Sequence, residues 1–286
     1  MDGLLILSKP SGLTSSQVVE KVRRRLRTKA GHTGTLDPLA RGVLLVLLGK
    51  ATRFSWIFTE LKKRYRVRGR LGIETDTYDV EGNVLAEREV SVSCDQLREV
   101  LQSFRGEIEQ TPPPFSAKKV GGKRAYRLAR KGVMPLLKPV RVKVYEIELL
   151  SCEIPHFEVE VLVSSGTYVR SLIHDAGQRL STGAIVTELI RTQVGPFGLD
   201  AAVDLERFLK DENPGRFVVP VEEGLSFLPA VSLDRFRGER ILHGNPVPLQ
   251  EEGEGYVRIY IDDLFVGVGK LSGGILKPER LIPPKT

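Results

Sequence analysis

One aspartate lies in a loop whose composition could serve catalysis. Asp37 stands in the segment Gly31-His32-Thr33-Gly34-Thr35-Leu36-Asp37-Pro38, and the surrounding stretch 30–42 contains three glycines and one proline. A carboxylate held in such a loop can act as a nucleophile or a base at a sugar or pyrimidine carbon. A loop of this length in a compact domain is more often functional than a simple connection. Aspartate also stabilises turns, so the segment alone leaves a structural role for Asp37 open.

Residues for other kinds of chemistry are missing or scattered. The sequence has no Walker loop, dinucleotide fingerprint, Gly-x-Ser-x-Gly elbow or zinc-ligand spacing. Asp76 and Asp79, and the pair Asp262-Asp263, could suggest Mg²⁺, but they stand in turn-forming sequence where aspartates cap turns. The four histidines are spread along the chain. We therefore expect no metal site and no bound cofactor.

The composition is that of an ordinary globular protein with a basic surface. Hydrophobic residues make up 41% and charged residues 28% of the 286-residue chain. A net charge of +7 suits a nucleic-acid partner, or simply a surface rich in lysine and arginine. No apolar run reaches the roughly 18 residues of a membrane helix, and Met1–Lys9 lacks the features of a signal peptide. We expect a cytoplasmic protein without membrane association, in which Cys94 and Cys152 are ordinary buried or half-buried thiols.

The elements that must position Asp37 can be predicted on both sides of its loop. Stretch 4–8 is expected to be a buried strand, and Thr14-Ser15-Ser16-Gln17 resembles a capping box that starts a helix. An apolar strand is expected over 43–48 and a helix over 51–61. The predicted helix after Thr14 has a basic face, either solvated or in contact with phosphates: Lys21, Arg23, Arg24, Arg25 and Arg27.

Segment 63–72 alternates with a period of two, which predicts a strand with one face in water. The expected inward face carries Tyr65, Val67, Gly69 and Leu71, and the outward face carries Arg64, Arg66, Arg68 and Arg70. These four arginines could bind RNA, or they could be solvated or paired locally.

The remaining pattern predicts a mixed α+β chain. Helices are expected over 96–104, 125–131 and 168–180, and strands over 140–150, 157–163 and 188–194. Segment 112–124 is extended, basic and irregular, so it cannot be a helix or a central strand. We expect a catalytic domain over 1–227 with a mixed, largely antiparallel sheet and an insertion at about 111–135. Short strands after position 227 predict a small β-rich domain over 228–286.

Several separated blocks of the sequence carry a family pattern. In order, they are Lys9-Pro10-x-Gly12-x-Thr14-Ser15, Gly31-His32-x-Gly34-Thr35-Leu36-Asp37-Pro38-Leu39-Ala40, Lys63-Arg64-Tyr65, Leu71-Gly72-x-x-Thr75-Asp76-Thr77-x-Asp79-x-x-Gly82, Ser116-Ala117-Lys118-Lys119, Gly122-x-x-Ala125-Tyr126, Ser165-Gly166-Thr167-Tyr168-Val169-Arg170-Ser171-Leu172 and Leu189-x-Arg191. From Leu5 to about Phe197 the chain closely resembles the TruB family of tRNA pseudouridine-55 synthases.

The resemblance implies an isomerase that converts the T-loop uridine 55 of tRNA to pseudouridine after flipping the base out of its stack. It implies a catalytic domain of pseudouridine synthase type and a C-terminal β-barrel of PUA type, which binds RNA. Asp37 matches the essential aspartate, Tyr65 the tyrosine that stacks on the target base, and Arg170 the arginine paired with the carboxylate.

The resemblance also implies a set of substrate-binding residues. His32 matches the histidine that fills the gap left by the flipped nucleotide, Leu189 a wall of the pocket, and Lys9 a lysine that supports the site. Tyr168 and Lys118 stand in matching blocks and are further candidates for substrate binding. The insertion at about 111–135 is expected to bind the T-stem-loop of tRNA. The protein is expected to act as a monomer without a protein partner.

These residue types suit the reaction. An arginine beside Asp37 would keep its carboxylate ionised in a closed pocket, and stacking on an aromatic ring recovers part of the cost of flipping a base. Conversion of uridine to pseudouridine changes no oxidation state and adds no group, so it needs no cofactor. Attack at C1′, attack at C6 and abstraction of a sugar proton stay open as first steps. A non-catalytic RNA-binding protein and a metal-dependent RNA hydrolase are the alternatives.

Overall fold

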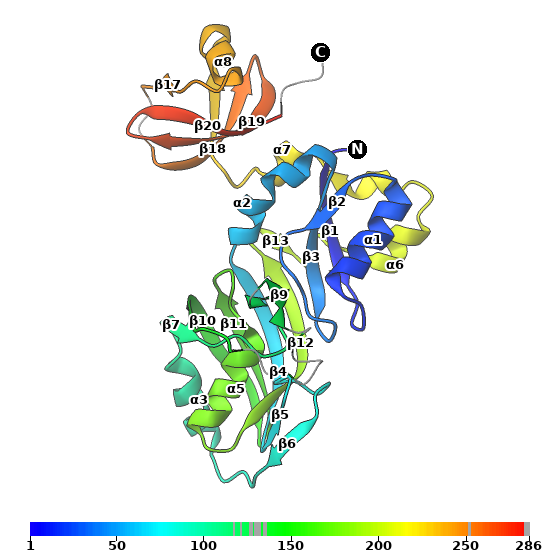
Figure 1. Cartoon of the computed structure of the whole chain (residues 1–286), viewed down its shortest axis with the longest axis vertical. Helices are drawn as coiled ribbons and strands as arrows, with labels where there is room; N and C mark the ends of the chain where they lie inside the picture. The colour runs from blue at the N-terminus through cyan, green and yellow to red at the C-terminus, as the bar shows by residue number, and fades with distance from the viewer. Residues whose placement is uncertain are drawn as a thin grey trace.

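The computed structural model describes residues 1–116, 118–120, 122–125, 128, 133, 136–250 and 253–282. Its main body is built on one long mixed sheet of order β14-β1-β3-β12-β4-β11-β10-β7 (Figure 1). In addition, β2 pairs with β3, β13 with β12 and β15 with β1. The pairs β1–β14 and β12–β3 are parallel, and the others in this sheet are antiparallel. The prediction of a mixed, largely antiparallel sheet is confirmed. The strands are β1 (Gly3–Lys9), β2 (Ala30–His32), β3 (Arg41–Leu48), β4 (Lys63–Leu71), β7 (Gly106–Gln110), β10 (Val140–Glu153), β11 (His156–Val163), β12 (Ala184–Val194), β13 (Phe197–Gly198), β14 (Val203–Asp204) and β15 (Val218–Val219).

The predicted capping box forms at the first helix. α1 (Ser15–Leu26) begins after Thr14, whose hydroxyl accepts from the Gln17 backbone N–H at 3.1 Å, while the Gln17 side chain accepts from the Thr14 N–H at 2.8 Å. Satisfying these donors fixes where the helix starts. Part of the basic face is used within the protein, because Arg23 donates to the Ala30 carbonyl and Arg25 to the Leu209 carbonyl.

The alternation predicted for β4 is confirmed. Its inward face is buried and its outward face is exposed or half-buried. Three of the outward arginines form ion pairs with acids on neighbouring strands, which confirms local pairing for them: Arg64 with Glu146 and Glu160, Arg66 with Glu158, and Arg68 with Glu158 and Glu188. Lys63 begins the same strand on the buried face.

β3 and β12 pair over only two positions, Ile190 with Arg41 and Arg191 with Gly42. Gly42 has a φ of 109°, and a Cβ there would lie 2.2 Å from the Arg191 carbonyl oxygen. Glycine is therefore required where the two strands touch. The loop that carries Asp37 ends at this junction, because it enters β3.

Helices and a small hairpin surround the sheet. α3 and α5 pack together, α3 against β10 and α5 against β12. The predicted helix over 51–61 is a 3₁₀ turn followed by α2, the predicted strand over 188–194 starts earlier at Ala184, and the predicted loop over 30–42 contains β2. These elements are a 3₁₀ turn (Gly49–Phe54), α2 (Ser55–Glu60), α3 (Cys94–Gln102), α5 (Val169–Arg179), α6 (Leu205–Lys210), a second 3₁₀ turn (Pro214–Phe217), α7 (Val221–Gly224), β5 (Ile73–Thr75) and β6 (Val84–Glu87).

The basic insertion contains a small antiparallel hairpin whose strands have two residues each, β8 (Lys119–Val120) and β9 (Lys123–Arg124). Most of the short helix predicted over 125–131 lies outside the described residues, as does Tyr126.

The expectation of two free thiols was wrong. Cys94, at the start of α3, and Cys152, near the end of β10, form a disulfide with their Cα atoms 5.9 Å apart. They are 58 positions apart in sequence, so nothing in their spacing indicated that the packing of α3 on β10 brings them together. The half-buried setting that was expected for them is correct.

A second sheet follows at one end of the molecule, next to α7 (Figure 1). Its strand order is β16-β18-β19-β20-β17, and it has a core of its own that includes Val231, Ile241 and Ile259. Trp56 of α2 packs edge-on against Tyr256 with ring centroids 4.6 Å apart, which joins the sheet to the main body. None of the helices in the described chain has the length and apolarity to cross a membrane. The elements are β16 (Ala230–Leu233), α8 (Arg235–Leu242), β17 (Val247–Pro248), β18 (Gly255–Ile261), β19 (Leu264–Ser272) and β20 (Ile275–Leu281).

Candidate active site

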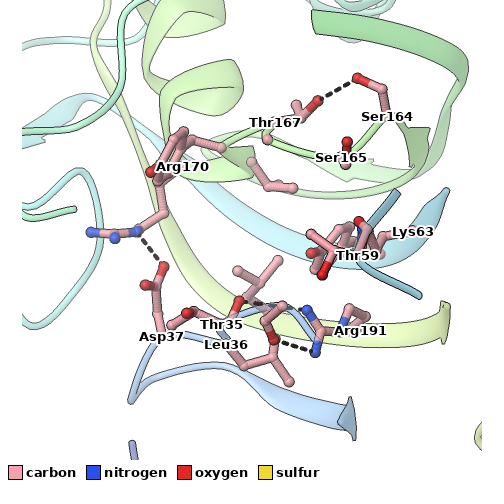
Figure 2. A pocket seen from close by; sticks show the side chains of 16 residues that line it. Thr35, Leu36, Asp37, Thr59, Lys63, Ser164, Ser165, Thr167, Arg170 and Arg191 are labelled. Carbon is pink, nitrogen blue, oxygen red and sulfur yellow. Dashed lines mark hydrogen bonds and ion pairs between the residues drawn. The ribbon is translucent and has the colours of Figure 1, made fainter. Parts of the chain in front are cut away.

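A cavity of about 230 Å³ opens beside the junction of β3 and β12. Its walls come from the Asp37 loop, the end of α2, the strands β4 and β12, and the turn 164–168 that leads into α5 (Figure 2). These segments are far apart in sequence, so the fold gathers the blocks that were singled out above. The lining residues include Asp37, Lys63, Tyr65, Tyr168, Arg170, Leu189 and Arg191.

Asp37 and Arg170 meet at one side of this cavity. The Arg170 Nε donates to Asp37 Oδ2 at 2.8 Å. The arginine side chain is 5% exposed and the aspartate side chain 32% exposed, so the pair has one buried partner and one that reaches the cavity. A charge-assisted hydrogen bond of this kind fixes the orientation of the carboxylate.

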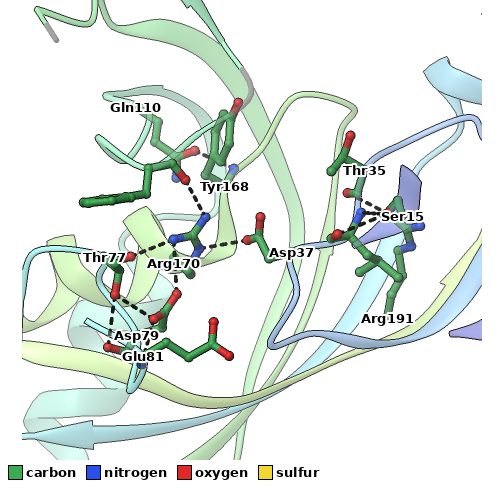
Figure 3. Close-up of polar contacts among 12 residues, drawn as sticks. Ser15, Thr35, Asp37, Thr77, Asp79, Glu81, Gln110, Tyr168, Arg170 and Arg191 are labelled. Carbon is green, nitrogen blue, oxygen red and sulfur yellow. Dashed lines mark hydrogen bonds and ion pairs between the residues drawn. The ribbon is translucent and has the colours of Figure 1, made fainter. Parts of the chain in front are cut away.

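Arg170 is held by three further acceptors (Figure 3). Its Nη1 donates to the Thr77 carbonyl at 2.7 Å and to Asp79 Oδ2 at 3.1 Å, and its Nη2 donates to the Phe115 carbonyl at 3.0 Å. One buried guanidinium thus bridges two carboxylates, and its rotamer is fixed before any ligand arrives.

Asp79 is itself positioned by its own turn. Its Oδ1 accepts from the Thr77 hydroxyl at 2.6 Å and from the Glu81 backbone N–H at 3.0 Å. The predicted turn role of Asp79 is therefore correct, but its second oxygen has a role that the turn did not indicate, because it pairs with Arg170. Among the residues that the structure describes, no three His, Cys, Asp or Glu side chains cluster as metal ligands.

The Asp37 loop is anchored from behind. The Ser15 hydroxyl donates to the Leu36 carbonyl at 3.0 Å and accepts from the Leu36 N–H at 2.8 Å. Lys9 is fully buried, and its Nζ donates to the carbonyls of Leu13 at 2.7 Å and Pro38 at 3.4 Å. Burial lowers the pKa of Lys9 to about 8, and the nearby Asp37 carboxylate opposes part of that shift. Lys9 is not among the lining residues, so the structure places it beneath the loop.

Tyr65 and Leu189 form part of the cavity wall. They come from the adjacent strands β4 and β12, are 8% and 5% exposed, and both line the cavity. Tyr168, which lines it too, donates its backbone N–H to the Gln110 side chain at 2.8 Å just before α5 begins.

Besides Lys9, two residues predicted from the sequence lie away from the cavity wall. His32 is half-buried on β2, and its Nδ1 has no hydrogen-bond partner among the described residues. Burial, and secondarily Arg191, lowers the pKa of this imidazole, which favours its neutral form. Lys118 is exposed and does not line the cavity. Several of its neighbours in the predicted insertion lie outside the described residues.

Lys63 and Arg191 line the cavity although sequence reasoning gave them no role. Their spacing could have indicated a role. Lys63 lies two positions from Tyr65 on β4, and Arg191 lies two positions from Leu189 on β12. Side chains two positions apart on a strand share a face. The Arg191 Nε donates to the Val43 carbonyl at 2.7 Å and its Nη2 to the Gly34 carbonyl at 3.1 Å.

Comparison with known families covers nearly the whole chain. Residues 22–169 match the model of the TruB family pseudouridylate synthase N-terminal domain. Residues 170–226 match the tRNA pseudouridylate synthase B C-terminal domain, and residues 229–282 match the model described as pseudouridine synthase II TruB, C-terminal.

Individual proteins are similar over the same length. The tRNA pseudouridine synthase B of Aquifex aeolicus is 50% identical over 99% of this chain and 100% of that protein. The protein of the same name from an Azoarcus species is 42% identical over 100% of this chain and 96% of its own. A chain in the crystal structure of a Cbf5-Nop10-Gar1 complex superimposes with a TM-score of 0.75 and 29% identity, over 99% of this chain and 85% of that one. A chain in an H/ACA RNP bound to a substrate RNA containing 2′-deoxyuridine gives 0.73 and 27%, with the same coverage.

Proposed function

We propose that this chain is a tRNA pseudouridine synthase that acts on uridine 55 of the T loop. The chain belongs to the TruB family of pseudouridylate synthases. The proposal rests on the relatives named tRNA pseudouridine synthase B and on one observation in this chain. That observation is the Asp37 carboxylate, held at 2.8 Å by a buried arginine at one side of the cavity.

The reaction breaks the N1–C1′ bond, turns the base and joins C5 to C1′, with loss of the C5 proton and gain of a proton at N1. Asp37 is the group that meets the ribose or the base, because its carboxylate reaches the cavity. Arg170 orients that carboxylate, because its guanidinium donates a charge-assisted hydrogen bond to one of the two oxygens. Attack at C1′, attack at C6 and removal of a sugar proton are all compatible with this role.

The target uridine must leave its stack to reach Asp37. Flipping costs a few kcal/mol, and stacking on an aromatic side chain returns about 1–3 kcal/mol per base. Tyr65 is assigned to this stacking, with Leu189 on the neighbouring strand as the second wall. His32, neutral and close to the Asp37 loop, is assigned to the gap in the RNA.

The tRNA-binding surface is assigned to basic residues that are not already paired with acidic side chains of the protein. Three arginines of β4 are paired with glutamates, so they contribute little attraction for phosphates. Lys118 and its insertion, together with a PUA-like domain over 228–286, are the proposed contacts to the T-stem-loop. The catalytic domain over 1–227 then holds the flipped base. The protein needs no partner chain for this arrangement and is expected to work as a monomer in the cytoplasm.

Release of tritium from tRNA labelled at C5 of uridine tests the function. We expect release in the presence of EDTA, and mapping of the product should place pseudouridine at position 55. A tRNA with cytidine at position 55 is the matched control and should release no tritium from that loop. Release that requires a divalent ion, or cleavage of the RNA chain, would support the hydrolase alternative. tRNA binding with no release would support the non-catalytic one.

A further inference from the structure

The cavity wall across from Asp37 carries two buried cations. Lys63 is 7% exposed and Arg191 is 2% exposed. They are neighbours, because a Cβ on Gly34 would lie 3.9 Å from Lys63 Cε and 3.7 Å from Arg191 Nη1. Figure 2 shows both on the opposite side of the cavity from Asp37 and Arg170.

Neither cation has an acidic partner in the described part of the chain. Lys63 donates to the Thr59 carbonyl at 2.5 Å, and Arg191 donates to the carbonyls of Val43 and Gly34. The acid that acts on Lys63 is Glu60, but its Oε2 accepts from the Ser165 hydroxyl at 2.8 Å. Buried charges without a counter-charge cost several kcal/mol. An anion that binds beside Lys63 and Arg191 would therefore be stabilised.

The charge of Lys63 survives this setting. Burial first, and Arg191 second, lower the pKa of Lys63 to about 8, while Glu60 raises it. An amine with that pKa is still mostly protonated at neutral pH. The wall is therefore cationic when substrate enters.

If the reaction begins at the sugar, by attack at C1′ or removal of a sugar proton, it supplies an anion at one stage only. Uridine is neutral when it enters the cavity. When N1–C1′ breaks, the electron pair of that bond stays with the base, and the uracil anion spreads its charge over N1 and the two carbonyl oxygens. When C5 joins C1′, the C5 proton leaves and N1 takes up a proton, which returns the base to neutrality. Groups that stabilise charge present only during the reaction lower its barrier.

We propose that Lys63, seated beside Arg191, is a catalytic residue that stabilises the uracil anion released from C1′. This inference rests on the proposed function. Tyr65 lies two positions along β4 on the same face as Lys63, so a base stacked on Tyr65 has its edge within reach of the lysine. Arg191 also ties β12 to the Asp37 loop through carbonyl bonds, which makes Lys63 the cleaner of the two to test.

Binding of free pyrimidines tests the charge preference without any turnover. The probes are 5-nitrouracil, which is ionised at neutral pH, and uracil, which is not. Calorimetry on the intact wild-type protein should show 5-nitrouracil binding about tenfold or more tighter than uracil, about 1.4 kcal/mol. Lys63→Met should bring this ratio close to one, and Lys63→Arg should retain most of it. Lys62→Met, the same change at the exposed neighbouring lysine, is the matched control and should keep the wild-type ratio.

Several outcomes overturn the proposal. They are an undiminished ratio in Lys63→Met, no preference in the wild type, or inorganic phosphate that binds at Lys63 and excludes 5-nitrouracil. Because these measurements need no tRNA, they are independent of whether uridine 55 is the substrate. In single-turnover tritium release, Lys63→Met should be slower by about 10²–10³-fold, with tRNA affinity unchanged. An unchanged rate also overturns the proposal.

Discussion

The imidazole of His174 stacks on the ring of Tyr78, with centroids 3.8 Å apart and planes inclined by 7°. His174 lies one helical turn after Arg170 on α5. Tyr78 stands between Thr77 and Asp79, which both accept hydrogen bonds from Arg170. Tyr78 also has a φ of 65°, which is unfavourable for a side chain of its size. One face of α5 therefore contacts the 77–79 turn twice, through Arg170 and, one helical turn later, through His174.

Loss of this stack should loosen the turn and reduce turnover. His174→Ala is expected to lower kcat by a few-fold to about tenfold, because an aromatic contact is worth roughly 0.5–1.5 kcal/mol and 1.36 kcal/mol of barrier is tenfold in rate. His174→Phe keeps a ring and should restore most of the rate. tRNA affinity should not change in either variant. Steady-state kinetics that give His174→Ala the wild-type kcat would refute the link between the stack and the catalytic pair.

Asp79→Asn removes one of the two carboxylates on Arg170 while keeping its shape. Hydrogen bonds to charged groups are worth about 1.5–3 kcal/mol, so single-turnover tritium release should slow by about 10- to 100-fold. Asp76→Asn is the matched control, because Asp76 accepts from Asn83 and makes no contact with Arg170. Equal slowing in both variants would mean that the effect comes from the turn and not from Arg170.

Asp175 should make the stability of the protein depend on pH. Burial raises the pKa of its carboxyl from 3.8 to about 6, and Arg179 opposes part of that shift. The folded state then binds this proton more tightly than the unfolded state, so the carboxyl costs stability progressively as pH rises from 3.8 through 6. At a pH well above 6, Asp175→Asn should raise the thermal unfolding midpoint. Near pH 3.8, the substitution should leave the midpoint unchanged. A midpoint shift of the same size at both pH values would contradict this assignment.

The Cys94–Cys152 disulfide closes a loop across α3 and β10. A bridge of this kind typically contributes about 2–4 kcal/mol, mainly by restricting the unfolded chain. Cys94→Ser should therefore lower the free energy of unfolding in denaturant by that amount. Reductant should lower it in the wild type and have no further effect on the variant. Identical unfolding curves for the wild type with and without reductant would show that the bridge does not form in solution.

Local patterns predicted much of the fold. The capping box at Thr14 and the two faces of β4 depend only on neighbouring residues, so the sequence was sufficient for both. The expectation of a pseudouridine synthase fold rested on the order of the blocks, and the family matches and the structural likeness to the Cbf5-containing complex confirm it.

Long-range contacts were harder to predict. The resemblance suggested that Arg170 meets Asp37, and the structure places them together. Nothing local indicated that Asp79 is the second partner of that arginine, because its turn explains the residue without one. The same limit hid the pairing of Cys94 with Cys152, and the packing of Trp56 on Tyr256.

The proposed reaction depends on the Asp37 carboxylate that Arg170 orients. Single-turnover tritium release by Asp37→Asn at saturating protein measures that dependence. The substitution preserves size, removes the charge and replaces one acceptor oxygen by an amide NH₂. We expect release to fall about a thousandfold or more, while tRNA affinity, measured on the same preparation by filter binding, stays within about threefold of the wild type. Release at the wild-type rate by tRNA-bound Asp37→Asn would contradict this dependence.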